Sequence, residues 1–289
     1  EIIPLTVDFV FTSIFNNPEN ISILESFLST YLDYDIKGKL KIGSRTLPVE
    51  GKDVLSKQVD LILYNGGDII NIELNNSFTP NLKERNIVYA CNMHGGQLKY
   101  KDNSYRNIKS TLQINLNASD RPYTEELVES YYLYDPKTET CFTKKLQIDV
   151  INLQNYNKEC YNQREEKLAR WSKMFLAKTY EELNKAIGED LMDNSVKKKL
   201  VNEVERCSED REFIELYSMY SKEELEWNTI LEDEKEYARE QGLTEGLEQG
   251  LQQGLEQGIN QTKEELRKIL IENGMDKEKI NQIIDNYKK

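Results

Sequence analysis

Asp60, Glu73 and Asn75 lie on two neighbouring apolar segments of residues 59–75, VDLILYNGGDIINIELN. The Asn-Gly-Gly stretch between runs rich in Val, Ile and Leu predicts an antiparallel hairpin. Folding back brings Asp60, near the start of the first run, opposite Glu73, near the end of the second. Asn75 follows Glu73 by two residues and therefore projects from the same face of its strand.

Two carboxylates on one face repel each other unless a cation lies between them. Hydrolysis of a phosphodiester by a divalent metal requires hard oxygen ligands held close together, and carboxylate and amide oxygens supply them. The spacing of Asp60, Glu73 and Asn75 equally fits a hairpin whose polar face is only hydrated. From the residues alone, both interpretations stay open.

Other catalytic chemistries have little support in the composition. His94 is the only histidine, so the chain has no His-rich metal site and no conventional Ser/His/Asp triad. The four cysteines lie far apart without a CxxC pair, which predicts reduced thiols and no zinc site. Catalysis must therefore use carboxylates, amides, lysines or hydroxyls.

Charge is distributed unevenly along a chain whose net charge is −13. Residues 201–240 carry 14 acidic and 5 basic side chains. Residues 83–109 are locally basic, and either contact a polyanion such as DNA or are ordinary hydrated surface residues. The basic side chains there are Lys83, Arg85, Lys99, Lys101, Arg106 and Lys109.

Strand and helix signals alternate through the first part of the chain. Apolar spacing predicts a helix over 21–32 and another after Pro80, loosened by Gly95-Gly96. Further strands are expected at 110–117 and 145–153. Together these elements predict an α/β domain over residues 1–185 with a central sheet flanked by helices.

The rest of the chain is helical in character. Residues 186–240 form an acidic helical region, and residues 241–289 contain a repeat with Gly at every fourth position followed by Leu or Ile. The repeat is either a helix that self-associates through residues 240–270 or a half-ordered linker. We expect no membrane contact and a cytoplasmic location, because no apolar run reaches the ~20 residues that span a bilayer.

The ordered combination of these motifs resembles the PD-(D/E)XK nuclease superfamily. It is more narrowly similar to the Rpn family of recombination-promoting nucleases, also described as PD-(D/E)XK nuclease family transposases. The resemblance is carried by the opening PLTVDFVF segment, by Asp60 with Glu73-Leu74-Asn75, and by RNIVY at 85–89 followed by Gln97. It implies a restriction-endonuclease-like fold and a metal-dependent DNA endonuclease linked to recombination, mobile elements or phage defence.

The resemblance also implies roles for particular residues. Asp60 and Glu73 would bind Mg²⁺ or Mn²⁺, with the backbone carbonyl of Leu74 as a third ligand. Asp8 would assist the metal or cap a helix. Gln97 and Arg85 would orient the water or the phosphate, or form hydrogen bonds within the fold.

Position 75 departs from the pattern, because the superfamily has Lys there and the close family commonly has Gln. Asn is shorter and uncharged, so it cannot neutralise charge in the transition state as Lys does. The alternative function is a weakly active or inactive nuclease fold that serves as an interaction or regulatory module. The expected DNA contacts are Lys83, Arg85, Lys99, Lys101 and Arg106.

Overall fold

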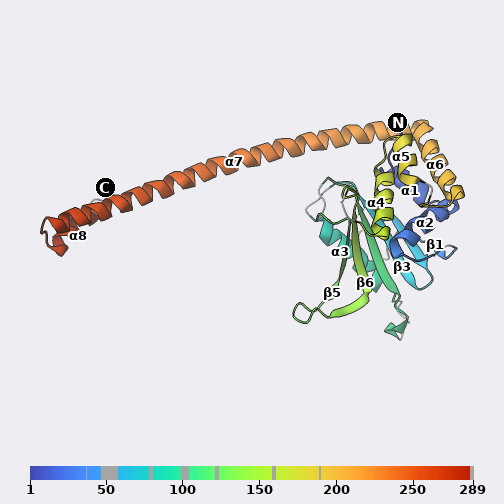
Figure 1. The fold of residues 1–289 in the computed structure, drawn as a ribbon, viewed down its shortest axis with the longest axis horizontal. Helices are drawn as coiled ribbons and strands as arrows, with labels where there is room; N and C mark the ends of the chain where they lie inside the picture. Colours follow the sequence, from blue (N-terminus) through green and yellow to red (C-terminus); the bar gives the residue numbers. More distant parts are fainter. Residues whose placement is uncertain are drawn as a thin grey trace, which may run out of the picture. The chain divides into compact units, whose positions relative to one another are not determined.

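A mixed six-stranded sheet forms the centre of the protein (Figure 1). The computed structural model describes residues 1–36, 38–46, 58–77, 81–98, 104–120, 124–157, 161–188 and 190–286. The strand order is β1-β2-β3-β4-β6-β5, in which β3, β4 and β6 are parallel and the remaining pairs are antiparallel. The strands are β1 (Leu40–Ile42), β2 (Leu61–Asn65), β3 (Asp68–Asn75), β4 (Ser110–Asn117), β5 (Val128–Tyr134) and β6 (Cys141–Asn152). The predicted α/β fold with a mixed central sheet flanked by helices is confirmed.

The predicted hairpin is the β2–β3 pair. Its register runs from Asn65 opposite Asp68 to Leu61 opposite Ile72, so Gly66 and Gly67 alone make the turn. Gly66 has φ +56°, a conformation that glycine adopts without the steric cost of a side chain. Strand β1, which pairs with β2, is short, and residues 47–57 lie outside the described residues.

Helices α1 (Asp8–Phe15), α2 (Ile21–Leu32) and α4 (Gln163–Leu176) pack together around an aromatic core. The short 3-10 turn η1 (Pro18–Asn20) joins α1 to α2, and α2 has the predicted bounds. The ring of Phe27 packs 5.2 Å from Trp171 and 5.7 Å from Phe175, both edge-on. Such edge contacts between buried rings add to the free energy gained by burying them.

The two faces of the sheet have different covers. Tyr31 of α2 donates a hydrogen bond to Asp149 of β6, whereas His94 of α3 (Leu82–Gly95) contacts Thr111 of β4, 3.0 Å away. Thr111 pairs with Leu146, which is three residues from Asp149 and so projects from the opposite face. Helix α3 therefore covers one face, and α2 with α4 covers the other (Figure 1). Gly95 and Gly96 end α3 rather than loosening it.

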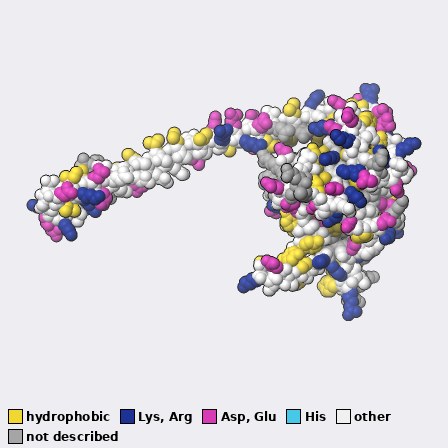
Figure 2. Space-filling view, in the orientation of Figure 1, with side chains coloured by type: hydrophobic (Ala, Val, Ile, Leu, Met, Phe, Trp, Pro, Cys, Tyr) yellow, Lys and Arg dark blue, Asp and Glu magenta, His cyan; other side chains and the backbone are white. Residues whose placement is uncertain are grey.

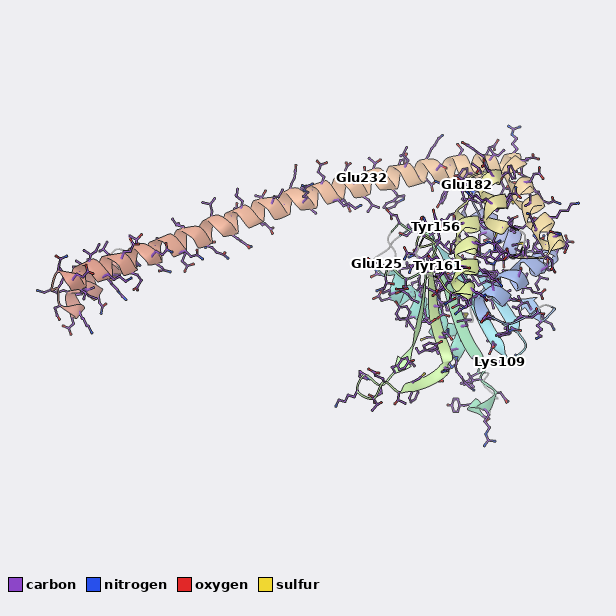
Figure 3. The ribbon with its side chains drawn as sticks, in the orientation of Figure 1. Lys109, Glu125, Tyr156, Tyr161, Glu182 and Glu232 are labelled. Carbon is purple, nitrogen blue, oxygen red and sulfur yellow. The ribbon has the colours of Figure 1, made fainter. Side chains whose placement is uncertain are left out.

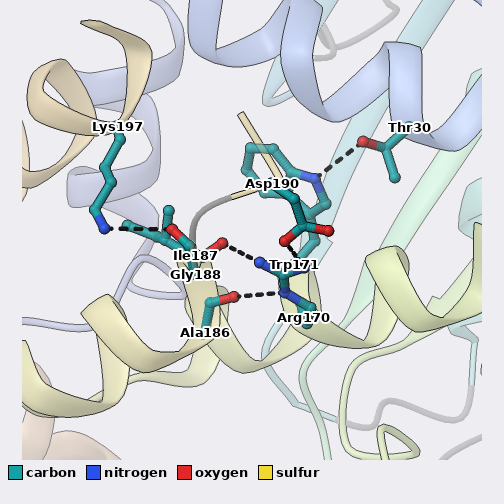
Figure 4. A network of polar contacts seen from close by, with 8 residues as sticks. All are labelled: Thr30, Arg170, Trp171, Ala186, Ile187, Gly188, Asp190 and Lys197. Carbon is teal, nitrogen blue, oxygen red and sulfur yellow. Dashed lines mark hydrogen bonds and ion pairs between the residues drawn. The ribbon is translucent and has the colours of Figure 1, made fainter. Parts of the chain in front are cut away.

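Helix α5 (Tyr180–Ile187) is anchored at both ends. Near its start, Glu182 accepts a hydrogen bond from the backbone N–H of Lys178 at 2.8 Å (Figure 3). At its end, the Arg170 guanidinium donates to the carbonyls of Ala186 and Ile187 and pairs with Asp190 (Figure 4). These contacts satisfy carbonyls that a helix terminus leaves without partners.

The chain divides into two compact units, residues 1–218 and 219–289. Helix α6 (Asn194–Glu209) belongs to the first unit, helix α8 (Lys277–Asn286) to the second, and α7 (Arg211–Glu272) continues from one into the other. The Gly-containing repeat is helical throughout and lies within α7, which also includes the C-terminal part of the acidic helical region. None of the described helices is long and apolar enough to cross a membrane.

Candidate active site

Asp60 and Glu73 lie side by side where β2 begins and β3 ends. Asp60 is one position beyond the Leu61–Ile72 pair, in the register that places it opposite Glu73. The backbone N–H of Asp60 donates to Glu73 Oε1 at 3.3 Å, and the backbone N–H of Leu74 donates to Asp60 Oδ2 at 2.8 Å. The structure thus brings together the two acids that the hairpin was expected to juxtapose.

Two amide side chains hold this acid pair in place. Asn71, two residues before Glu73 on the same face of β3, donates to Glu73 Oε1 at 2.9 Å. Asn16, at the end of α1, donates to the backbone carbonyl of Asp60 at 2.8 Å. Both acids therefore have fixed orientations before any ligand binds.

Burial and mutual repulsion both act on the acids. Glu73 is only 4% exposed, and this desolvation, followed by the charge of Asp60, raises the pKa of Glu73 to about 8. Burial also raises the pKa of Asp60, against hydrogen bonding from Leu74 and the charges of Arg45 and Arg85. Perturbed pKa values of this kind are typical of functional sites.

Arg85, the fourth residue of α3, brings positive charge close to the acids. Its Nη2 donates a hydrogen bond to Asn75 Oδ1, and its charge lowers the pKa of Asp60, Glu73 and Asp8. Asn75 is buried, and its Nδ2 donates to none of the described residues. Asn75 itself is uncharged, but its side-chain oxygen holds the Arg85 guanidinium close to the acid pair.

Asp8 borders the site at the first residue of α1. Its Oδ1 accepts a hydrogen bond from Asn76 Nδ2 at 2.9 Å. Desolvation, followed by the charge of Asp60, raises the pKa of Asp8. Within the described residues, no group of three or more His, Cys, Asp or Glu side chains is arranged to hold a metal ion, so Asp8 does not complete a three-acid set.

Gln97 lies away from the acids, and its contacts are hydrogen bonds within the fold, the second of the two roles implied for it. Its side chain binds the backbone N–H and carbonyl of Lys109 and the hydroxyl of Thr111. Thr111 pairs with Ile69, four residues before Glu73, which is about 13 Å along the strand. Because α3 starts near the acids and ends at the far end of the sheet, a residue just after it cannot reach them. Gln97 ties the end of α3 to the start of β4.

The expected DNA contacts divide into two groups. Lys83 and Arg85 lie near the start of α3, and Arg85 is close to the acids. Arg106 lies in the 3-10 turn η2 (Tyr105–Asn107), at the end of the sheet where β4 begins. Lys99 and Lys101 lie outside the described residues.

The acid pair is suited to a hard divalent cation. Asp60 Oδ1 and Glu73 Oε2 accept no hydrogen bond from the part of the chain that the structure describes, so each acid offers one oxygen. A cation between them would relieve the repulsion that raises the pKa of Glu73. Mg²⁺ is commonly held by one or two carboxylates, with water and substrate phosphate completing its shell. The two carboxylates of Asp60 and Glu73 are therefore enough protein side-chain ligands for Mg²⁺.

Sequence reasoning missed Asn71 and Arg45. Asn71 has the same two-residue spacing from Glu73 as Asn75, so strand alternation could have placed it on the shared face. Arg45 contacts the start of β2 by donating from Nε to the carbonyl of Val59 at 2.9 Å. It is distant in sequence from both acids, so no local pattern placed it near them.

Comparisons with known proteins give one match. No curated protein and no solved structure matches the chain. Residues 5–234 match the PD-(D/E)XK nuclease family transposases. The match covers the α/β domain and most of the acidic helical region, and it ends before the Gly-containing repeat. An Asp and a Glu paired at the ends of two adjacent strands, on a mixed sheet flanked by helices, fit this match, and the chain belongs to the PD-(D/E)XK nuclease family transposases.

Proposed function

We propose that the protein is a metal-dependent endonuclease that hydrolyses phosphodiester bonds in DNA. The family supports a nuclease-type function. The observation that supports the finer proposal is the partly buried hydrogen bond from the backbone N–H of Asp60 to the buried Glu73 carboxylate. It places side by side two acids whose repulsion a divalent cation would relieve. A fold that needed only a hydrated polar hairpin would not require two acids at this depth, because buried charges are costly unless they are paired or bind metal.

Asp60 and Glu73 would hold Mg²⁺ or Mn²⁺, with the carbonyl of Leu74 as the further protein ligand. When bound, the ion supplies charge neutralisation at the phosphate and activation of a water molecule. Asn71 contributes by fixing one oxygen of Glu73, which directs the other oxygen away from the hydrogen bond. Second-layer contacts of this kind orient ligands and tune their affinity.

Arg85 would take over the electrostatic part that a lysine at position 75 has in the superfamily. Its guanidinium is held by Asn75 and lies close enough to Asp60 and Glu73 to lower the pKa of both. A planar guanidinium is also well suited to a phosphate, which it can bind through two donors. The buried Nδ2 of Asn75, without a partner among the described residues, would donate to a phosphate oxygen.

Plasmid cleavage tests this proposal. With Mg²⁺ or Mn²⁺ the wild type should nick or linearise supercoiled plasmid, and Asp60→Asn should reduce the rate at least 100-fold, as should chelation by EDTA. Asp149→Asn is a matched control, because Asp149 is also a buried strand carboxylate but projects from the opposite face. Equal cleavage by the wild type and Asp60→Asn would remove Asp60 from the mechanism.

A second candidate function is an interaction module with self-association through residues 240–270. The observation that favours it is the apolar row Leu243, Leu247, Leu251 and Leu255 of α7, each about two-thirds exposed. A Cβ added at each glycine of the repeat would meet nothing within 4 Å, so a partner backbone can approach closely there. This candidate requires an assembly larger than one chain, whereas the nuclease proposal does not.

A further inference from the structure

Two segments extend beyond the sheet at the end where β4 begins (Figure 1). One is the turn η2 with the residues that follow it, and the other is the outer part of the β5–β6 hairpin. Lys145 of β6 donates from Nζ to the carbonyl of Ile108 at 3.0 Å, so the two segments are connected at their bases. Lys109, labelled in Figure 3, lies at the same end and donates to the carbonyl of Gly66 at 3.2 Å.

These segments present aromatic side chains that the described residues do not cover. Phe142 is 85% exposed and Tyr105 is 77% exposed, the highest values among the exposed large hydrophobic side chains of the described residues. Leu133 and Tyr134 of the paired strand are also more than half exposed. Figure 2 shows hydrophobic side chains along the projecting hairpin, with Lys and Arg side chains nearby. Exposed apolar side chains on projecting segments are typical of interaction sites.

The charge around these aromatics is positive in a chain that is strongly acidic overall. Residues 104–110 and 141–146 contain Arg106, Lys109, Lys144 and Lys145 and no acid, whereas the whole chain carries −13. The acids of the hairpin lie elsewhere on it, and Asp135 of the connecting turn is hydrogen-bonded to the backbone N–H groups of Lys137 and Thr138. Exposed aromatic rings interspersed with lysine and arginine fit single-stranded nucleic acid, whose bases stack while its phosphates contact the cations.

We propose that this aromatic-basic platform, consisting of Tyr105, Arg106, Lys109, Phe142, Lys144 and Lys145, binds unpaired bases of a DNA strand that flanks the cleavage site. The inference rests on the proposed function, since it assumes a DNA substrate. Tyr105 and Phe142 stack on bases, and the basic side chains contact phosphates.

The register of the sheet sets the spacing between the platform and the acids. Glu73 pairs with Asn115, which pairs with Val150, and Phe142 lies eight residues before Val150 on β6. Eight residues of strand span about 26 Å, close to eight base-pair steps of 3.4 Å each. The substrate is therefore DNA that is unpaired about eight nucleotides from the cut.

The test is binding of labelled DNA to the full-length protein in EDTA, measured by fluorescence anisotropy. The probes are a blunt duplex and the same duplex with an eight-nucleotide single-stranded tail at either end. The wild type should bind one tailed duplex at least tenfold more tightly than the blunt one, and Tyr105→Ala/Phe142→Ala should lose most of this preference. Tyr34→Ala, which changes an aromatic side chain that is 49% exposed and lies outside the platform, should keep it. Lys144→Gln/Lys145→Gln should reduce the salt dependence of binding by about one phosphate contact per lysine.

Since these measurements contain no metal, they separate the two proposals. Tail preference that depends on Tyr105 and Phe142, in a protein that never cleaves DNA, would support the platform and contradict the nuclease. Cleavage of DNA with a tail preference unchanged in Tyr105→Ala/Phe142→Ala would overturn the platform. The platform would also be overturned if Tyr105→Ala/Phe142→Ala bound DNA normally but was a monomer in light scattering where the wild type is a dimer. That result would assign the aromatic side chains to a contact between chains.

Discussion

The Arg85 guanidinium donates a hydrogen bond to the side-chain oxygen of Asn75, at the strand position where the superfamily has lysine. The positive charge at this site therefore comes from a helix rather than from β3. Since Arg85 also lowers the pKa of Asp60 and Glu73, it is close to both acids.

Replacing Arg85 should reduce catalysis. We expect Arg85→Gln to lower the rate of plasmid cleavage by about 100-fold, the usual loss when one donor to a developing charge is removed. Asn75→Lys added to this variant should restore part of the rate, because it returns a cation to the strand position. Rates measured for the single and double variants decide the point, and an undiminished rate in Arg85→Gln would exclude Arg85 from the reaction.

The buried acid pair should make the metal-free protein less stable as pH rises. Glu73 keeps its proton up to about pH 8 in the folded chain, whereas its ordinary pKa is 4.5. Between these values the folded state binds more protons than the unfolded state, so stability is lost as pH rises through this range. Thermal melting in EDTA from pH 5 to 8.5 should show a steeper fall in Tm for the wild type than for Glu73→Gln. Parallel curves for the two proteins would show that Glu73 does not titrate in this way.

Asn71 should affect metal affinity through Glu73. Asn71→Ala removes the hydrogen bond to Glu73 Oε1, and we expect Mn²⁺ binding to weaken about 10-fold to 100-fold. Gln113→Ala is a matched control, since Gln113 is a buried amide of the neighbouring strand that bonds Asn115 instead of an acid. Calorimetry on both variants measures the difference, and equal affinities would assign Asn71 to the fold alone.

Gln97 should affect stability rather than chemistry. Its side chain makes three hydrogen bonds to Lys109 and Thr111, and their loss in Gln97→Ala should lower the free energy of unfolding by about 1–2 kcal/mol. Denaturant titration measures this loss. The cleavage rate at a temperature where the variant is folded should stay within a factor of two, and a 100-fold slower rate would return Gln97 to the catalytic set.

Self-association through α7 can be tested on the full chain. Leu247→Gln/Leu251→Gln replaces two side chains that are 69% and 68% exposed, so the helix loses apolar surface without losing packing inside one chain. We expect a lower mass in light scattering than for the wild type. Gln249→Ser/Gln253→Ser, between the apolar positions, should leave the mass unchanged. If all three proteins are monomers, the interaction-module proposal loses its basis.

Local signals were sufficient for the β2–β3 hairpin, for β4, for the later part of β6 and for the acid pair, whereas β1 and β5 were not predicted. The Asn-Gly-Gly turn sets the β2–β3 register, and that register alone places Asp60 opposite Glu73. The sequence left open whether Gln97 acts at the site or within the fold, because its distance from the acids depends on the direction of α3 across the sheet, which periodicity does not report. The neighbours Arg45 and Asn16 come from segments that are distant in sequence, so only the folded chain shows their contacts. The glycines of the repeat left a helix and a half-ordered linker both open, and in the structure α7 continues through them.

The most direct test of the central claim is a calorimetric titration of Mn²⁺ into the wild type and into Glu73→Gln without DNA. The acid pair predicts about one ion per chain for the wild type and no measurable binding to the variant. Equal binding by the two proteins, or no binding by the wild type, would contradict a metal site formed by Asp60 and Glu73.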